Sequence, residues 1–90
     1  MRVLLIYDIA NDRIRTRVAD VCLDYGLERI QFSAFAGRLG RAHQRELELK
    51  VTRLLGRETA KVRFILLDEH SWAQQIIIEQ EGLGNDTDDA

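Results

Sequence analysis

The sequence predicts an α+β domain in which two helices cover one face of an antiparallel sheet. Segments with strand and helix character follow one another in the order strand, helix, strand, strand, helix, strand. The length of 90 residues fits one such domain. At this size folding buries only roughly 60 to 65% of the surface that the unfolded chain exposes, so a partner subunit would add stability.

The first strand and the first helix are expected in residues 1–25. The run MRVLLIYDI has the length and the Val, Ile and Tyr content of a strand, and its nearly continuous apolar character predicts burial on both faces. A helix is expected over residues 13–25, with Asn11 or Asp12 as its N-cap and Gly26 as its C-terminal stop. Cys22 lies on its apolar face, where we expect a small core residue.

Residues 26–40 alternate in character before a second helix begins. They suffice for two short strands or one bent long strand. No Asn-Gly or Asp-Gly pair marks a tight hairpin, and the reversal is expected between Phe32 and Gly37. The second helix is expected from Arg41 to Leu55, with Leu47 and Val51 on its apolar face.

The last strands are expected at KVRFILLD, residues 61–68, and at WAQQIIIEQ, residues 72–80. Trp72 would then cap the core between them. The whole order is that of a ferredoxin-like βαββαβ sandwich with an additional C-terminal strand, whose second sheet face is left bare. Pairing of the apolar strand at Ile76–Ile78 with a second subunit would protect its edge, so a homodimer is expected. The domain would occupy residues 1–81, and residues 82–90 would form an acidic, disordered tail.

Composition and charge narrow the function classes. One cysteine allows no internal disulfide, and no Cys or His pair has zinc-ligand spacing. Neither a signal peptide nor a membrane-spanning run is present, so we expect a cytoplasmic protein with no membrane partner. All 13 basic residues, 11 of them arginine, lie in residues 1–63, which carry a net charge of +5. This favours a polyanion partner such as an RNA or DNA backbone; a solvated arginine-rich surface is the alternative.

Asp8 is the candidate catalytic and metal-ligating residue. A carboxylate at the end of a strand is held at a fixed point, and Mg²⁺ takes one or two carboxylates together with water and phosphate oxygens. One chain offers half of such a site. If the two-fold axis of a dimer passes near this strand end, two Asp8 carboxylates share one ion, which activates water and neutralises a phosphodiester. The alternative is that Asp8 is a loop or cap residue.

Arginines near Asp8 are the candidate phosphate ligands. Arg15 and Arg17 lie in the first helical turns, about 200° apart on an ideal helix, so both face one phosphate only near a frayed helix start. Arg29 and Arg38 flank the central strands. Phe32 and Phe35 are candidates for base stacking, although ordinary sheet packing is the favoured interpretation of both. Ser33 has no evident base beside it, which argues against a serine triad.

These segments together resemble the Cas2 family of small CRISPR-associated adaptation proteins. The resemblance rests on YDI at residues 7–9, RTRV at 15–18, YG at 25–26 and RIQFSAF at 29–35. The last of these is similar to the family's Arg-Val-Gln-x-Ser-Val-Phe, from which it departs at Ala34. Ala36 follows where many relatives carry an acid, so the departures bear more on substrate preference than on the metal.

The resemblance implies a ferredoxin-like homodimer in which Asp8 of each chain holds one Mg²⁺ ion. Asp8 would position the ion and its hydroxide. Arg15, Arg17 and Arg29 would bind phosphates, and Phe35, with Tyr7 and Ser33 of the same motifs, would support the site. It further implies metal-dependent endonuclease activity on single-stranded RNA or double-stranded DNA, a CRISPR-associated integrase as partner, and a C-terminal strand paired with the other subunit.

Three functions remain open on the sequence alone. The first is an endonuclease that uses an Asp8 pair and Mg²⁺. The second is a non-catalytic dimer whose arginines hold DNA and bridge the integrase during spacer acquisition, with Asp8 as a structural cap. The third is a regulatory or interaction domain, since this fold hosts many unrelated functions.

Overall fold

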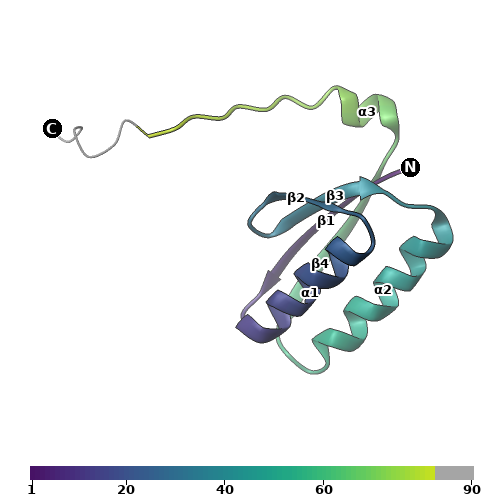
Figure 1. Cartoon of the computed structure of the whole chain (residues 1–90), viewed down its shortest axis with the longest axis vertical. Coiled ribbons are helices and arrows are strands. Elements are labelled where there is room, and N and C mark those ends of the chain that lie inside the picture. The colour runs from purple at the N-terminus through teal and green to yellow at the C-terminus, as the bar shows by residue number, and fades with distance from the viewer. Residues whose placement is uncertain (83–90) are drawn as a thin grey trace, which may run out of the picture.

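The computed structural model describes residues 1–82 and contains the predicted order of elements. Strands β1 (Arg2–Ile9), β2 (Glu28–Gln31), β3 (Ala34–Arg38) and β4 (Ala60–Leu67) form one antiparallel sheet in the order β2-β3-β1-β4. Helices α1 (Asp12–Asp24) and α2 (Arg41–Leu55) lie together on one side of it (Figure 1). The ferredoxin-like α+β class is therefore confirmed. In this part of the chain no helix has the length and apolarity needed to cross a membrane.

The two long helices begin and end where the sequence places their caps. The Oδ1 atom of Asn11 accepts a hydrogen bond from the backbone N–H of Ile14 at 2.9 Å, which identifies Asn11 as the N-cap of α1. Gly26 follows α1 with a φ of +83°, a conformation that costs glycine little because it has no Cβ. Gly40 and Gly56 flank α2.

The core lies between the helices and one face of the sheet. Leu5, Phe35, Leu47, Val18 and Cys22 are fully buried there. Burial of a side chain of the size of Leu or Phe contributes roughly 1.5–3 kcal/mol. The core position of Cys22 is thus confirmed, and desolvation raises the pKa of its thiol to about 12.

The prediction that β1 is buried on both faces is wrong for the single chain. Its residues alternate: Val3, Leu5, Tyr7 and Ile9 face the core and are at most 4% exposed, whereas Ile6 is 37% exposed. The second face of the sheet has no helix over it (Figure 1). We call this second face the open face; it carries Leu4, Ile6 and Asp8 from β1 and, directly opposite them, Ile65, Arg63 and Lys61 from β4.

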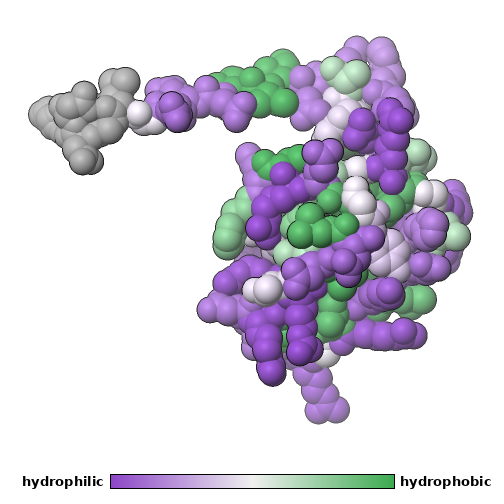
Figure 2. Space-filling model, viewed as in Figure 1, coloured by the Kyte–Doolittle hydropathy of each residue, from purple (hydrophilic) through white to green (hydrophobic). Residues whose placement is uncertain are grey.

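The additional strand expected at Ile76–Ile78 is also absent from the single chain. After β4 the chain forms a short helix, α3 (Glu69–Ala73), and residues 75–82 then run away from the domain without helix or strand (Figure 1). Ile76, Ile77 and Ile78 are 86%, 69% and 89% exposed, and they form the hydrophobic stretch of this extension (Figure 2). A strand needs a neighbouring edge to satisfy its backbone groups, and this chain presents none along the extension. The expected tail lies, apart from Gly82, outside the described residues.

Trp72 does not lie between two strands as expected, because it belongs to α3. It is half-buried beneath Arg2, whose Cζ lies 5.0 Å from the centre of the indole ring. Glu69 of the same helix binds Arg2 and Arg38 at the end of the sheet where β1 begins and β3 ends. These contacts fix α3 against the ends of β1 and β3.

Candidate functional site

Asp8 lies on the open face, near the C-terminal end of β1. It is exposed, and Lys61 is its direct cross-strand neighbour in β4. Within residues 1–82 Asp8 takes part in no ion pair. Its carboxylate is therefore available to a ligand from outside the chain.

Within residues 1–82 Asp8 does not belong to a complete set of metal ligands. The described residues contain no group of three or more His, Cys, Asp or Glu side chains close enough to hold an ion. A carboxylate oxygen is a ligand that suits Mg²⁺, but Mg²⁺ bound through one protein carboxylate keeps most of its water. Asp8 thus offers one carboxylate ligand to an ion that keeps most of its water.

Arg15 and Arg29 both lie near Phe32 of the β2–β3 turn, and both line the same small pocket. The Nη1 atom of Arg15 donates a hydrogen bond to the carbonyl oxygen of Ile9 at 2.8 Å, and Nη2 contacts the carboxylate of Asp12. These bonds hold the guanidinium beside the end of β1. The Cζ atoms of Arg15 and Arg29 lie 5.9 Å and 5.8 Å from the centre of the Phe32 ring. The structure thereby brings together two residues that are far apart in the sequence.

Tyr7, Ser33 and Phe35 form the support of this arginine pair. The rings of Tyr7 and Phe35 are stacked, with centroids 6.2 Å apart, and Phe35 is fully buried. The Cζ of Arg29 lies 4.9 Å from the centre of the Phe35 ring. The backbone N–H of Tyr7 donates to the carbonyl oxygen of Ser33 at 3.0 Å, which ties the β2–β3 turn to β1. Ser33 therefore contributes through its backbone.

The remaining two predicted arginines lie elsewhere. Arg17 is exposed on α1 and is free to bind a phosphate at the helix surface. Arg38 lies at the other end of the sheet, opposite Arg2, and two of its nitrogens donate to the Glu69 carboxylate at 3.0 Å each. Hydrogen bonds from Arg38 hold the pKa of Glu69 below its ordinary value. A phosphate would have to compete with Glu69 for Arg38.

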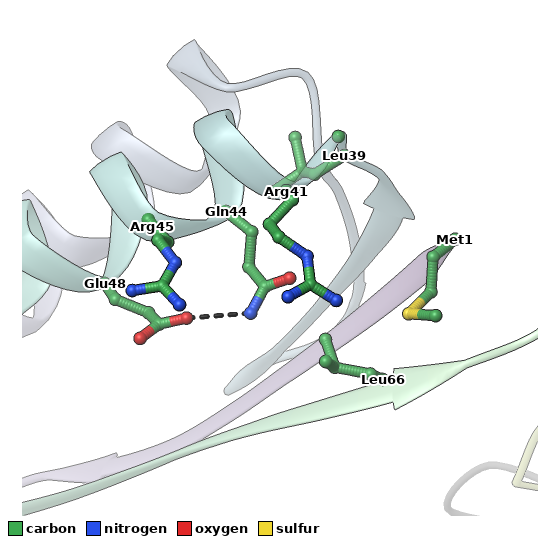
Figure 3. A pocket seen from close by; sticks show the side chains of 8 residues that line it. Met1, Leu39, Arg41, Gln44, Arg45, Glu48 and Leu66 are labelled. Atoms are coloured by element: carbon green, nitrogen blue, oxygen red, sulfur yellow. Dashed lines mark hydrogen bonds between the residues drawn. The ribbon is translucent and has the colours of Figure 1, made fainter.

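A groove of about 350 Å³ lies at that other end, between the start of α2 and the ends of β1 and β4 (Figure 3). Arg41 and Arg45 point into it beside Leu66, and Glu48 accepts a hydrogen bond from Gln44 at 2.8 Å. None of the predicted site residues lines this groove. The predicted site residues near Asp8 lie at the other end of the sheet from this groove.

Phe32 is the residue whose role the sequence interpretation assigned wrongly. Packing within the sheet was favoured for both phenylalanines, and this is correct for Phe35 but not for Phe32, which is 71% exposed. Phe32 occupies the β2–β3 turn, and a turn residue has no sheet neighbour to cover it. The polar residues on either side of it, Gln31 and Ser33, are the sequence feature that could have indicated an exposed turn.

Comparisons with known proteins show the family of this chain. A family profile described as "CRISPR associated protein Cas2" matches residues 1–75. The chain belongs to the Cas2 family. A curated relative from Chloroflexus aurantiacus, "CRISPR-associated endoribonuclease Cas2 2", is 54% identical over 81 residues, which are 90% of this chain and 95% of the relative.

Two further Cas2 relatives extend the comparison. A crystal structure of Streptococcus pyogenes Cas2 superposes with a TM-score of 0.76 at 26% identity and covers 88% of this chain and 100% of that one. A "CRISPR-associated endonuclease Cas1/endonuclease Cas2 fusion" from Thermoproteus tenax is 37% identical over 71 residues, which are 79% of this chain and 27% of the fusion. The Cas2 fold thus occurs both as a separate chain and as part of a larger polypeptide.

Proposed function

We propose that this chain acts in CRISPR adaptation, in the cytoplasm, as a homodimeric, metal-dependent endonuclease. In this proposal it cleaves phosphodiester bonds of single-stranded RNA or double-stranded DNA at one Mg²⁺ ion that two Asp8 carboxylates share. The observation that carries the proposal is the position of Asp8 on the same open face as Leu4, Ile6 and Ile65. The exposed isoleucines of this face favour its burial against a second copy, although the face also carries Asp8, Arg63 and Lys61.

A face-to-face dimer would place the two half-sites opposite each other. Burial of the open face around a two-fold axis near the end of β1 brings one Asp8 from each chain to the axis. Lys61, directly opposite Asp8 in β4, would offset part of the negative charge of the two carboxylates. The names of the relatives as endoribonucleases support the reaction class.

Each residue then has a distinct role in the mechanism. Asp8 would hold the ion, whose chemistry is to lower the pKa of bound water and to neutralise charge on the scissile phosphate. Arg15 and Arg29 would bind backbone phosphates at the adjacent edge, and Arg17 would extend this contact along α1. Tyr7, Ser33 and Phe35 would keep the arginine pair in place.

Cleavage assays on labelled single-stranded RNA and duplex DNA, with and without Mg²⁺, test this proposal. Asp8→Ala should lose Mg²⁺-dependent cleavage, while nucleic-acid binding at low salt and the dimeric state are retained. Asp24→Ala removes an exposed carboxylate from the end of α1 and serves as the matched control. Cleavage by Asp8→Ala at the wild-type rate would refute the composite metal site.

The second candidate is a non-catalytic, DNA-binding dimer that bridges the CRISPR-associated integrase during spacer acquisition. The fusion of a Cas1 and a Cas2 part in the Thermoproteus tenax relative favours a shared task of the two proteins. Absence of cleavage by the wild-type protein, with salt-dependent duplex binding, would select this candidate. Affinity should then fall steeply as salt concentration rises, because phosphate contacts release counterions.

A further inference from the structure

A small pocket between α1 and the β2–β3 turn combines the proposed phosphate-binding arginines with two residues that have no role in the proposed cleavage, Phe32 and Asp20. Tyr7, Arg15, Arg29, Phe32 and Asp20 line it together with three further residues of α1. Its volume is about 260 Å³. Pockets for drug-sized molecules typically measure about 300–1,000 Å³. This pocket therefore suits a single base or phosphate.

Phe32 offers a stacking surface at the mouth of this pocket. With 71% of its surface exposed, it is the most exposed aromatic side chain of the core domain, residues 1–73. The guanidinium groups of Arg15 and Arg29 lie at the outer limit of cation–π distance from its ring. The ring stays largely exposed although both guanidinium groups lie near it. A base can therefore stack on Phe32 while its phosphate lies close to the arginines.

The hydroxyl of Tyr7 provides an independent observation. Tyr7 is 4% exposed, and its hydroxyl oxygen is buried without a hydrogen-bond partner among the described residues. A buried, unpaired polar group is costly, and most such groups in proteins are satisfied. Tyr7 lines the pocket, so a polar ligand there can satisfy this hydroxyl once a neighbouring lining side chain shifts to expose it.

The charges around the pocket determine where the phosphate and the base of a bound nucleotide lie. Arg15 uses one of its five N–H groups for Ile9 and one for Asp12, which leaves three for a ligand. Asp20 lines the α1 side of the pocket and disfavours a phosphate there, but its carboxylate can accept a hydrogen bond from an amino group of a base. The phosphate is thus directed to the arginines.

We propose that this pocket binds one unpaired nucleotide of single-stranded nucleic acid, with the base on Phe32 and its phosphate between Arg15 and Arg29. The inference rests on the proposed nucleic-acid function and adds to it a preference for unpaired strands or duplex ends with an overhang. A blunt duplex offers no free base face, so it binds through its backbone alone. The pocket therefore distinguishes a strand with an unpaired base from a blunt duplex.

Equilibrium binding of a single-stranded oligonucleotide and of a blunt duplex, at one fixed low salt concentration, tests the proposal. Phe32→Ala should weaken binding of the single strand by about 5- to 150-fold, the range that stacking of one base on an aromatic ring gives. Binding of the blunt duplex should change by less than about twofold, and Phe32→Tyr should restore the single-strand affinity. Leu49→Ala, an exposed apolar residue on α2, is the matched control.

Tyr7→Phe separates a ligand contact from a structural role. Without ligand, loss of an unpaired buried hydroxyl should leave the melting temperature unchanged or raise it, yet single-strand affinity should fall by about 2- to 10-fold. Equal effects of Phe32→Ala on single strand and duplex, or none on either, would overturn the inference and leave the proposed function intact. If Phe32→Ala lost integrase binding but kept its affinity for the single strand, a protein would cover this ring. That result would also overturn the inference. If the wild type binds neither probe, both proposals fail.

Discussion

Replacement of Ile6 by glutamate tests whether the open face is the subunit interface. Ile6 lies directly opposite Arg63, so in one chain the new carboxylate gains an opposite-charge cross-strand pair worth about 0.2–1 kcal/mol. Loss of the buried part of Ile6 costs about 1–2 kcal/mol. A domain of this length is stable by roughly 5–13 kcal/mol, so the protomer should stay folded.

The effect on the dimer is larger. Ile6 is 37% exposed in the single chain, and complete burial of that remainder contributes about 0.6–1.1 kcal/mol per side chain. Two such losses per dimer raise the dissociation constant by about 7- to 40-fold. Two glutamates must in addition be desolvated close to the Asp8 pair, which costs several kcal/mol more. We therefore expect the dissociation constant of the dimer to rise by more than about 100-fold.

Sedimentation equilibrium over a range of protein concentrations measures this constant. Leu49→Glu introduces the same charge on α2, on the helix side of the sheet, and should leave dimerisation unchanged. Ile6→Glu should also lose Mg²⁺-dependent cleavage although Asp8 is intact. A wild-type dissociation constant for Ile6→Glu would refute the assignment of the open face, and cleavage by a monomer would refute the shared ion.

Two further predictions concern stability and the docking of α3. A Cβ at Gly37 would lie 2.8 Å from Leu27 Cδ2 and 3.2 Å from Leu27 Cα, so Gly37→Ala should cost about 1–3 kcal/mol and lower the melting temperature by about 4–24 °C. Gly40→Ser, where a Cβ meets nothing within 4 Å, should be neutral or stabilising; equal melting of both variants would contradict the steric argument. Because Arg38 lowers the pKa of Glu69, α3 docking should persist at neutral pH and be lost as pH falls through that pKa, below 4.5. Fluorescence of Trp72 should follow this loss, and Glu69→Gln should show the acid-state signal at pH 7, whereas an unchanged signal would disprove the contact.

The helices could be predicted closely because their signals are local. Asn11 and Gly26 bound α1, and both act through backbone groups of their immediate neighbours. The strands depended on partners distant in the sequence. The exposure of Ile6 depends on what covers the second face of the sheet, and the strand at Ile76–Ile78 depends on an edge that one chain does not supply. The sequence pattern carries neither piece of information.

The candidate site was predicted residue by residue but not as an arrangement. Asp8 and Arg15 could be singled out because each adjoins a strand or helix terminus. The pairing of Arg15 with Arg29 required the position of the β2–β3 reversal, which no strong turn signal marks. Once the turn is at Phe32 and Ser33, the exposure of Phe32 and the approach of both arginines follow together.

The structure places the proposed metal-binding residue and the proposed phosphate-binding residues on different faces of the sheet. Asp8 and the Arg15–Arg29 pair lie at the same end of the sheet, since Arg15 binds the carbonyl of Ile9 and Ser33 binds Tyr7. They lie on opposite faces, however, because Asp8 belongs to the open face and Tyr7 to the core face of β1. In the proposed mechanism, a phosphate held by the arginines is therefore a different one from the phosphate cleaved at Asp8. A nucleic-acid strand that reaches both Asp8 and the arginines has to pass around this end of the sheet. Such a path favours a flexible, single-stranded segment over a stiff duplex at this point of the surface.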